Sequence, residues 1–409
     1  MVIIVIFSNY RNEHRIISFY KLESLINKVM SSHSPRVVVV TGSIGKSSTK
    51  HAISKALSKS FAVNQNPGDA NGGDELRVSF FGICLRELKY PPGIWGMFYW
   101  LYIGLLIKWR SHWYPYDILV LELSETEFVK DLQELDRFLM ILNPELCIIT
   151  GISGAHMSRM GSRKSIVKAL VHIASSAKAV IYNSDHKKLV PFSNLPNFYG
   201  SYSMNDGSYS NPNLHGGVRA SIAAAQKVAE YFDISLNEVK PILSALKPLT
   251  GRMNTMIAMN GAVVIDDTFN ASTEAVINGL EHVRTFNDLY KVAVLGGINE
   301  LGEYEEDEHK KIAKIANEIA DLTIFIGKQF KEIASSYKLN SSVWFNNSLE
   351  AGLYIKDNSQ SNWVLYAKGS QDKIFVEEAI KPVLSWKNRK RLPRQSRYWM
   401  KIKRAYFKS

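Results

Sequence analysis

Cysteine is scarce in this sequence, and an apolar run long enough to span a membrane is missing. Cys84 and Cys147 are the only cysteines among 409 residues, which excludes a disulfide framework and a repeated metal-ligand spacing of cysteines. The apolar start, Met1–Phe7, is too short for an anchor and lacks the basic region of a signal peptide. We therefore expect a protein of the reducing cytoplasm.

Acidic residues are absent from the end of the chain. Residues 387–409 hold ten lysines and arginines and no aspartate or glutamate, so they carry most of the net charge of +12. We interpret them as a basic tail on a nearly neutral body. Its aromatic residues favour contact with an anionic membrane, and a solvated C-terminal helix is an equally good interpretation. We expect no nucleic-acid partner.

The most apolar stretch, residues 91–107, has no charge and precedes Lys108 and Arg110. It is shorter than the roughly 20 residues that cross a bilayer. Its aromatic residues and flanking cations predict a peripheral or partner-facing helix over 94–107. A helix buried against a sheet is the alternative, and we favour it slightly over the peripheral helix.

The most informative motif present is a strand, a glycine turn and a helix within Arg36–Lys50. The valines Val37–Val40 predict a buried parallel strand. Glycines in the turn that follows let the backbone approach a polyphosphate, which the N–H groups of the next helix would bind. A well-capped turn without ligand is the alternative. The predicted phosphate-binding residues are Gly42, Ser43, Gly45, Lys46, Ser47 and Ser48.

Polar residues follow two further predicted strands. Glu122 ends the apolar run 116–122, and His156 follows the run 144–150. Ligands bind at the carboxyl ends of strands in open α/β sheets. We therefore predict that Ser47, Glu122 and His156 hold Mg²⁺, although either of the last two alone is more often a cap or a surface residue.

Strands and helices alternate again after Gly251–Arg252, which indicates a second doubly wound α/β domain. The predicted fold is α/β, with a central P-loop domain built on a mostly parallel sheet. We divide the chain into a lead-in at 1–35, a central domain at 36–250, a C-terminal domain at 251–386 and the basic tail at 387–409.

The order of these motifs resembles the Mur ligase family of ATP-dependent peptidoglycan-precursor ligases. The likeness covers about residues 36–385 and is strongest to the branch that adds D-alanyl-D-alanine to UDP-N-acetylmuramoyl-tripeptide. The matching pieces are Thr41–Thr49, Leu119–Glu122, Ile149–His156 with Gly161–Ser162, Gly251–Arg252, Ile265–Ala271, Leu295–Gly302 with His309, and Lys368–Ser370.

The resemblance implies ATP and Mg²⁺ as cofactors and a C-terminal domain that is Rossmann-like. A substrate carboxylate would take the γ-phosphate to form an acyl phosphate, and an amine would then displace phosphate. The resemblance makes Lys46, Glu122, His156 and Arg252 catalytic. It assigns nucleotide contacts to Asp267 and Asn270, and contacts with a small-molecule or peptide substrate to His309, Lys368 and Ser370. We expect a monomer.

The sequence departs from the family at several points. Only about 35 residues precede the loop, so we expect no N-terminal UDP-binding domain. The family's carbamoylated lysine corresponds to Leu170, with Lys168 two positions earlier and His172 two later. The alternatives are a related ligase with another amino-acid or peptide acceptor, and a catalytically silent nucleotide-binding protein at the inner face of the membrane. A kinase or general NTPase is least favoured.

Overall fold

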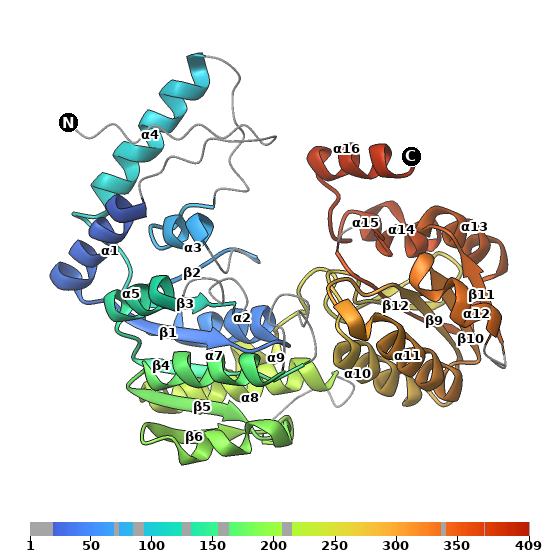
Figure 1. The fold of residues 1–409 in the computed structure, drawn as a ribbon, viewed down its shortest axis with the longest axis horizontal. Coiled ribbons are helices and arrows are strands. Elements are labelled where there is room, and N and C mark those ends of the chain that lie inside the picture. The colour runs from blue at the N-terminus through green and yellow to red at the C-terminus, as the bar shows by residue number, and fades with distance from the viewer. Residues whose placement is uncertain are drawn as a thin grey trace. The chain divides into compact units, whose positions relative to one another are not determined.

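A computed structural model gives the fold of the chain (Figure 1). It describes residues 19–68, 73–84, 94–124, 132–153, 163–206, 215–336, 341–371 and 373–408. The chain forms two compact units. The first unit comprises Met1–Ile152, Lys164–Pro212 and Gly217–Leu246, and the second comprises Ser153–Arg163, Asn213–Gly216 and Lys247–Ser409.

The first unit is built on a parallel sheet in the order β2-β3-β1-β4-β5-β6. Its central strand holds the four valines Val37–Val40, all buried, as expected for a parallel sheet covered on both faces. The predicted α/β class is confirmed. The strands are β1 (Arg36–Thr41), β2 (Val63–Gln65), β3 (Ile118–Glu122), β4 (Leu146–Ile149), β5 (Ala179–Asn183) and β6 (Phe198–Tyr202).

Helices pack on this sheet and on one another. Helix α2 contacts β1, β2 and β3, and α1 contacts α3 and α5. The described part of the predicted lead-in is thus a core helix, since Leu22, Ile26 and Val29 are fully buried. The helices of this unit are α1 (Phe19–His33), α2 (Lys46–Leu57), α3 (Gly73–Ser79), α4 (Ile94–Arg110), α5 (Leu132–Leu142), α7 (Arg163–Ser175), η2 (Lys187–Asn194), α8 (Gly216–Tyr231) and α9 (Leu236–Ser244).

Helix α4 extends away from the sheet of the first unit (Figure 1). Ile103 and Ile107 on one face are buried, whereas Leu105 and Trp109 are more than half exposed. The helix is therefore apolar on both faces and covered on one. Among the described residues, neither α4 nor any other helix combines the length and apolar character needed to cross a membrane.

The second unit has a sheet in the order β11-β10-β9-β12-β8-β7, parallel except for β7 at its edge. Val292 and Val294 of β9 enter one buried cluster, while Ala293 and Leu295 enter another on the opposite face. The strands are β7 (Asn254–Ile257), β8 (Val263–Asp266), β9 (Tyr290–Gly296), β10 (Leu322–Ile326), β11 (Ser342–Phe345) and β12 (Trp363–Lys368).

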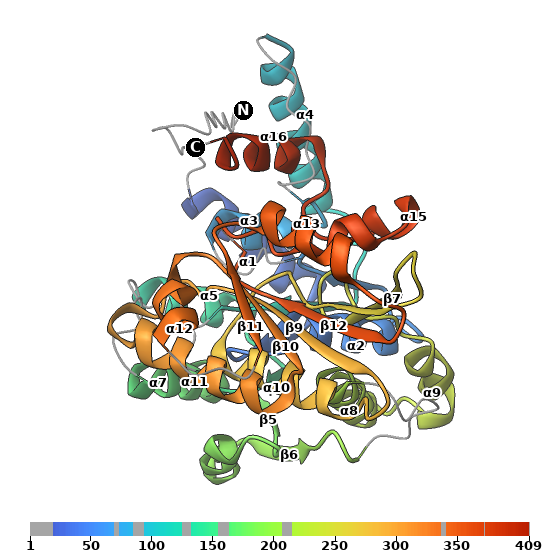
Figure 2. The same cartoon turned by 90° about the vertical axis from the view of Figure 1, so that its right-hand side faces the viewer.

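Helices cover both faces of this second sheet. Helices α10 and α11 lie on one side and α13 on the other (Figure 2). The longer helices are α10 (Thr273–Arg284), α11 (Glu305–Ile319), α12 (Lys331–Ser336), α13 (Ser348–Asn358) and α16 (Arg397–Tyr406). The short ones are η3 (Gly302–Tyr304), η4 (Lys328–Phe330), α14 (Glu377–Ile380), η5 (Lys381–Val383) and α15 (Trp386–Arg389).

The predicted basic tail, as far as residue 408, is folded onto the second unit. Lys403 of α16 is buried, with its ammonium group 2.7 Å from a carboxylate oxygen of Glu377 and 2.7 Å from one of Glu378. Arg397 and Lys401 on the outer face of α16 are exposed. Part of the positive charge of this segment is therefore neutralised inside the unit, and part faces solvent.

Candidate active site

The turn after β1 is shaped so that only glycine fits at its first position. Gly42 has φ +123°, and a Cβ there would lie 2.6 Å from the Thr150 hydroxyl oxygen and 2.8 Å from the Gly151 carbonyl oxygen. The Ser43 N–H donates to that same carbonyl at 2.8 Å. The turn is thus packed closely against the end of β4, which a residue with a Cβ at position 42 would prevent.

Polar groups that suit an anion surround this turn. The Lys46 ammonium group, at the first residue of α2, donates to the Gly42 carbonyl oxygen. The Ser43 hydroxyl is buried and has no hydrogen-bond partner among the described residues. A bound phosphate would supply its missing acceptor, and the N-terminus of α2 adds N–H donors with a positive dipole. Ser47 is buried in the first turn of α2, and Gly45 precedes the helix with φ +81°.

Glu122 lies at the carboxyl end of β3, beside the end of β1, as predicted. Two residues that the sequence analysis does not single out hold it there. The Lys50 ammonium group is 3.2 Å from a Glu122 carboxylate oxygen, with both side chains buried. The Asn66 amide bridges the Glu122 backbone, with its oxygen accepting from the Glu122 N–H at 2.8 Å and its nitrogen donating to the Glu122 carbonyl at 3.0 Å.

Lys50 also fixes the loop that follows β2. Its ammonium group donates to the carbonyl oxygens of Asn66 at 2.7 Å and Gly68 at 3.0 Å. The sequence offers one local signal for Lys50, its position four residues after Lys46 on the same helix. No local signal joins it to Glu122.

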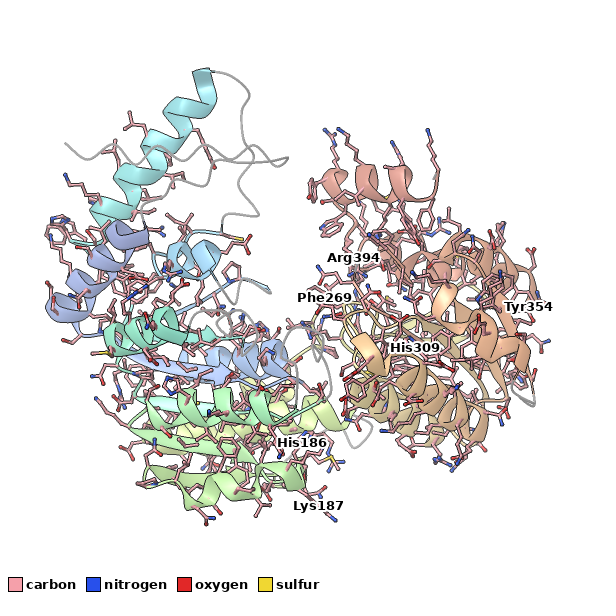
Figure 3. The ribbon with its side chains drawn as sticks, viewed as in Figure 1. His186, Lys187, Phe269, His309, Tyr354 and Arg394 are labelled. Carbon is pink, nitrogen blue, oxygen red and sulfur yellow. The ribbon has the colours of Figure 1, made fainter. Side chains whose placement is uncertain are left out.

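The predicted metal ligands are described only in part. Ser47 and Glu122 are buried oxygen donors of the kind that Mg²⁺ prefers, while His156 lies outside the described residues. A residue that the sequence analysis misses lies nearby, since a Cβ on Gly151 would be 2.8 Å from Nε2 of His186 (Figure 3). The oxygen chemistry of Ser47 and Glu122 suits Mg²⁺, but the described residues include no cluster of three or more metal-binding His, Cys, Asp or Glu side chains, so an ion held by these two residues stays a prediction.

The position of the family's carbamoylated lysine is apolar here. Leu170 of α7 is fully buried, and Lys168 is exposed. Two residues along a helix turn a side chain to a different face, so Lys168 does not replace the missing group in this register. Nε2 of His172 is hydrogen-bonded to the exposed carboxylate of Asp136.

In the second unit, Asp267 and Lys368 form a buried ion pair. The Lys368 ammonium group donates to a carboxylate oxygen of Asp267 at 2.6 Å and to the Asn270 carbonyl at 2.9 Å. The other Asp267 oxygen accepts from the Met253 N–H at 3.2 Å. Three of the predicted site residues, Asp267, Asn270 and Lys368, are thus brought together by one ammonium group.

Arg252 lies over an aromatic ring of the same motif. Its guanidinium carbon is 4.4 Å from the centre of the Phe269 ring. Phe269 in turn donates its N–H to the Gly251 carbonyl at 3.0 Å. The predicted pair Gly251–Arg252 and the motif 266–271 are therefore joined directly by a hydrogen bond and a ring contact.

His309 and Ser370 hold the loop after β9. The fully buried His309 accepts from the Ile298 N–H at 2.9 Å through Nε2, and its Nδ1 lies 2.5 Å from the Glu305 carbonyl oxygen. Ser370 accepts from the Asn299 N–H at 2.8 Å. The resemblance predicts substrate contacts for both residues. Because backbone groups engage both ring nitrogens of His309, this geometry favours a bracing role, and the substrate contact stays a prediction.

Burial shifts the pKa of two further groups near Asp267. Burial raises the pKa of the Asp266 carboxyl to about 7, although hydrogen bonds from Thr268 act in the opposite direction. Burial lowers the pKa of His215 to about 4, partly opposed by Asp267. His215 stacks edge-on against His282, with ring centres 5.1 Å apart. Neither Asp266 nor His215 is among the site residues predicted from the sequence.

Comparison with known proteins gives the same family as the motifs. Residues 251–371 match the model of the Mur ligase, glutamate ligase domain. The chain is 24% identical over 396 residues to a UDP-N-acetylmuramoyl-tripeptide–D-alanyl-D-alanine ligase of Bacillus subtilis, covering 89% of this chain and 79% of that protein.

Solved structures show the same fold. The chain is similar to the crystal structure of MurF ligase from Thermotoga maritima in complex with ADP, with a TM-score of 0.69 and 19% identity. The alignment covers 93% of this chain and 87% of the MurF chain. A bifunctional folylpolyglutamate synthase/dihydrofolate synthase from Yersinia pestis, complexed with AMPPNP and Mn, aligns with a TM-score of 0.58 and 15% identity. The alignment covers 87% of this chain and 92% of the synthase chain. Residues 251–371 thus carry a Mur ligase glutamate ligase domain, and the chain has the fold of the Mur ligases, as the motif resemblance predicted.

Proposed function

We propose that this protein is an ATP-dependent ligase that forms an amide bond in the synthesis of a peptidoglycan precursor. The observation that carries the proposal is the glycine turn of the first unit, closed against β4 and supplied with Lys46 and with the Ser43 hydroxyl, which lacks a partner within the described part of the chain. The naming of relatives as D-alanyl-D-alanine ligases supports this choice of substrate class.

The reaction has two steps. A substrate carboxylate attacks the γ-phosphorus of ATP, giving an acyl phosphate and ADP. An amine then attacks the acyl carbon, losing a proton as inorganic phosphate leaves. Positioning and charge neutralisation provide most of the catalysis in phosphoryl transfer. We assign Lys46 and the Ser43 hydroxyl to the phosphates, and Arg252, Asp267 and Asn270 to further nucleotide contacts.

Ser47 and Glu122 would hold Mg²⁺, together with His156 by resemblance. When bound, the ion neutralises negative charge on the phosphates. We further propose that Lys368 and Ser370 help to orient the amine substrate by fixing the motif loops, with His309 acting only through the loop after β9. We also propose a cytoplasmic monomer, and a chain with only two cysteines, Cys84 and Cys147, suits that compartment.

Phosphate release tests the proposal. Purified protein with ATP and Mg²⁺ should release phosphate only when both a carboxylate substrate, such as a UDP-muramoyl tripeptide, and an amine such as D-alanyl-D-alanine are present. Lys46→Ala should reduce the rate by about a hundredfold or more, because it removes a charge that stabilises the transition state. Phosphate release that is stimulated by other amino acids, and not by D-alanyl-D-alanine, would favour the related-ligase alternative. Nucleotide binding without stimulation by any acceptor would overturn the ligase proposal and favour the silent binder.

A second candidate function, peripheral contact with an anionic membrane, is favoured by helix α4. Leu101, Tyr102, Leu105 and Trp109 are 45–59% exposed and fall on one side of the helix, next to the exposed Lys108. Apolar and aromatic side chains beside cations are typical of helices that lie in a membrane interface. The exposed outer face of α16 supplies further positive charge.

Vesicle sedimentation tests this contact. Wild-type protein should sediment with phosphatidylglycerol vesicles, and the variant Leu105→Gln with Trp109→Gln should not. Met140→Gln, which changes a residue 81% exposed on α5, is the matched control. Neutralising the exposed Arg397, Lys401 and Arg404 should weaken binding at low salt only. Equal sedimentation of all variants would contradict the proposal.

A further inference from the structure

Residues 392–394, shortly before α16, are buried in the second unit, although they lie within the predicted basic tail. The Arg394 side chain is 3% exposed, and its guanidinium group makes two hydrogen bonds to the Glu377 carboxylate, at 2.8 and 2.6 Å. Arg394 has φ +54°, a left-handed conformation that is unfavourable for a residue with a Cβ. Surrounding contacts must therefore hold this residue in place.

The remaining donors of Arg394 bind the backbone of the motif that contains Asp267. Nη2 donates to the Thr268 carbonyl at 2.6 Å, and Nη1 donates to the Phe269 carbonyl at 2.8 Å (Figure 3). The planar fork of an arginine can bind a carboxylate and two carbonyls at once, which a lysine cannot do. One side chain thus joins α14 to the turn after β8.

The neighbouring proline packs on a second piece of backbone, the Gly251–Arg252 pair that is hydrogen-bonded to this turn. A Cβ on Gly251 would lie 2.4 Å from Cγ of Pro393, so the proline ring packs directly on that glycine. Gly251 accepts from the Phe269 N–H, and the Phe269 ring lies under the Arg252 guanidinium group. The segment 393–394 therefore contacts both pieces of backbone that carry Arg252 and Asp267.

Two buried cations meet at one buried carboxylate. Glu377 is fully buried and pairs with Lys403 as well as with Arg394. Replacing a buried ion pair by apolar groups often leaves stability unchanged, so such a pair is weak evidence of a purely stabilising role. Arg394 contributes by fixing the positions of two backbone carbonyl oxygens, those of the two residues between Asp267 and Asn270.

We propose that Arg394 is a positioning residue for nucleotide binding, acting through Phe269 on Arg252 and Asp267. The inference rests on the proposed function in one respect, the assignment of these two residues to nucleotide contacts. It makes the C-terminal segment a necessary part of the site rather than an appendage, so that removal of residues 387–409 would impair nucleotide binding as well as any membrane contact.

Three variants of the full-length protein test the proposal. Arg394→Met removes the fork but leaves Glu377 buried with Lys403 alone, so it also carries a risk of misfolding. Arg394→Met combined with Glu377→Gln removes both charges. Arg284→Met is the matched control, because it breaks an Arg–Glu pair with Glu281 on α10 that is exposed. The measurements are ADP affinity by calorimetry, thermal stability, and amide hydrogen exchange at Phe269.

We expect ADP binding to weaken about tenfold in both Arg394 variants, because small misplacements of binding groups are costly, and exchange at Phe269 to accelerate. The control should match wild type in both. Recovery of wild-type ADP affinity in the double variant would overturn the proposal, since Arg394 would then act only on stability. If the wild-type protein does not bind ADP, the proposed function fails. In that case, unchanged exchange at Phe269 in the Arg394 variants would also show that Arg394 does not order the turn.

Discussion

The ammonium group of Lys50 lies 3.2 Å from the carboxylate of Glu122, and both side chains are less than 5% exposed. The pair joins the phosphate-loop helix to the end of β3. Lys50 also donates to two carbonyls of the loop after β2. One lysine thus links a predicted metal ligand, the helix of the phosphate loop and the polar loop that follows β2.

Lys50→Met should destabilise the first unit by about 3 kcal/mol, because it leaves the Glu122 charge buried without this partner. Combining it with Glu122→Gln should recover part of the loss. Urea unfolding provides the measurement, and Lys55→Met, which changes an exposed lysine of the same helix, is the control. A Lys50 variant as stable as the Lys55 control would contradict the importance of the pair.

Gly42→Ala should weaken nucleotide binding, because an added Cβ would collide with Thr150 and Gly151. Gly68→Ala is a matched control. Gly68 also has a positive φ, +47°, but a Cβ there meets nothing within 4 Å. Gly68→Ala should lose about 1 kcal/mol of stability from backbone strain. Gly42→Ala should lose more because of the collision, and it alone should lose ADP affinity in calorimetry. Equal ADP affinities of the two variants would show that the glycine turn after β1 tolerates the added methyl group.

Local sequence patterns predicted the elements that are buried on both faces. The run Val37–Val40 lies within β1, and the apolar run 116–122 contains β3. Edge strands were harder to predict. Strand β7 follows the Gly251–Arg252 motif directly, and alternate residues of it, such as Ile257, are exposed. Its pattern therefore lacks the continuous apolar run of a central strand.

The predicted site residues were found by motif, but the contacts that hold them were not. Lys50 and Glu122 lie far apart in the sequence, and so do Arg394 and the Thr268 carbonyl that it binds. Nothing in the local composition of either segment indicates its partner. A run of cations is ordinarily solvated, so composition alone does not distinguish the buried Arg394 and Lys403 from their exposed neighbours. Tertiary pairing decides such cases, and single-sequence patterns do not contain it.

Asp266→Asn should change how stability depends on pH. Burial raises the pKa of Asp266 from its ordinary value of 3.8 to about 7. Between about pH 4 and 7 the folded protein therefore holds a proton that the unfolded chain has lost, and this contribution to stability disappears as the pH rises through 7. The asparagine variant does not titrate at this position, so its stability relative to wild type should increase from pH 5 to pH 8.

Thermal or urea unfolding of both proteins at several pH values measures this difference. Asp288→Asn, at an acidic residue in the loop before β9, serves as a comparison. A stability difference between Asp266→Asn and wild type that stays constant from pH 5 to pH 8 would show that Asp266 has an ordinary pKa in the folded protein.

His309→Leu should separate a bracing role from a substrate contact. The substitution removes the acceptor for the buried Ile298 N–H, and an unsatisfied buried donor costs about 1–3 kcal/mol. Hydrogen exchange at Ile298 should accelerate, and thermal stability should fall. His309→Gln retains an oxygen acceptor and should restore much of both. If His309 also binds substrate directly, both variants should raise the KM for the amine, and His309→Gln should do so even though exchange at Ile298 is slow again.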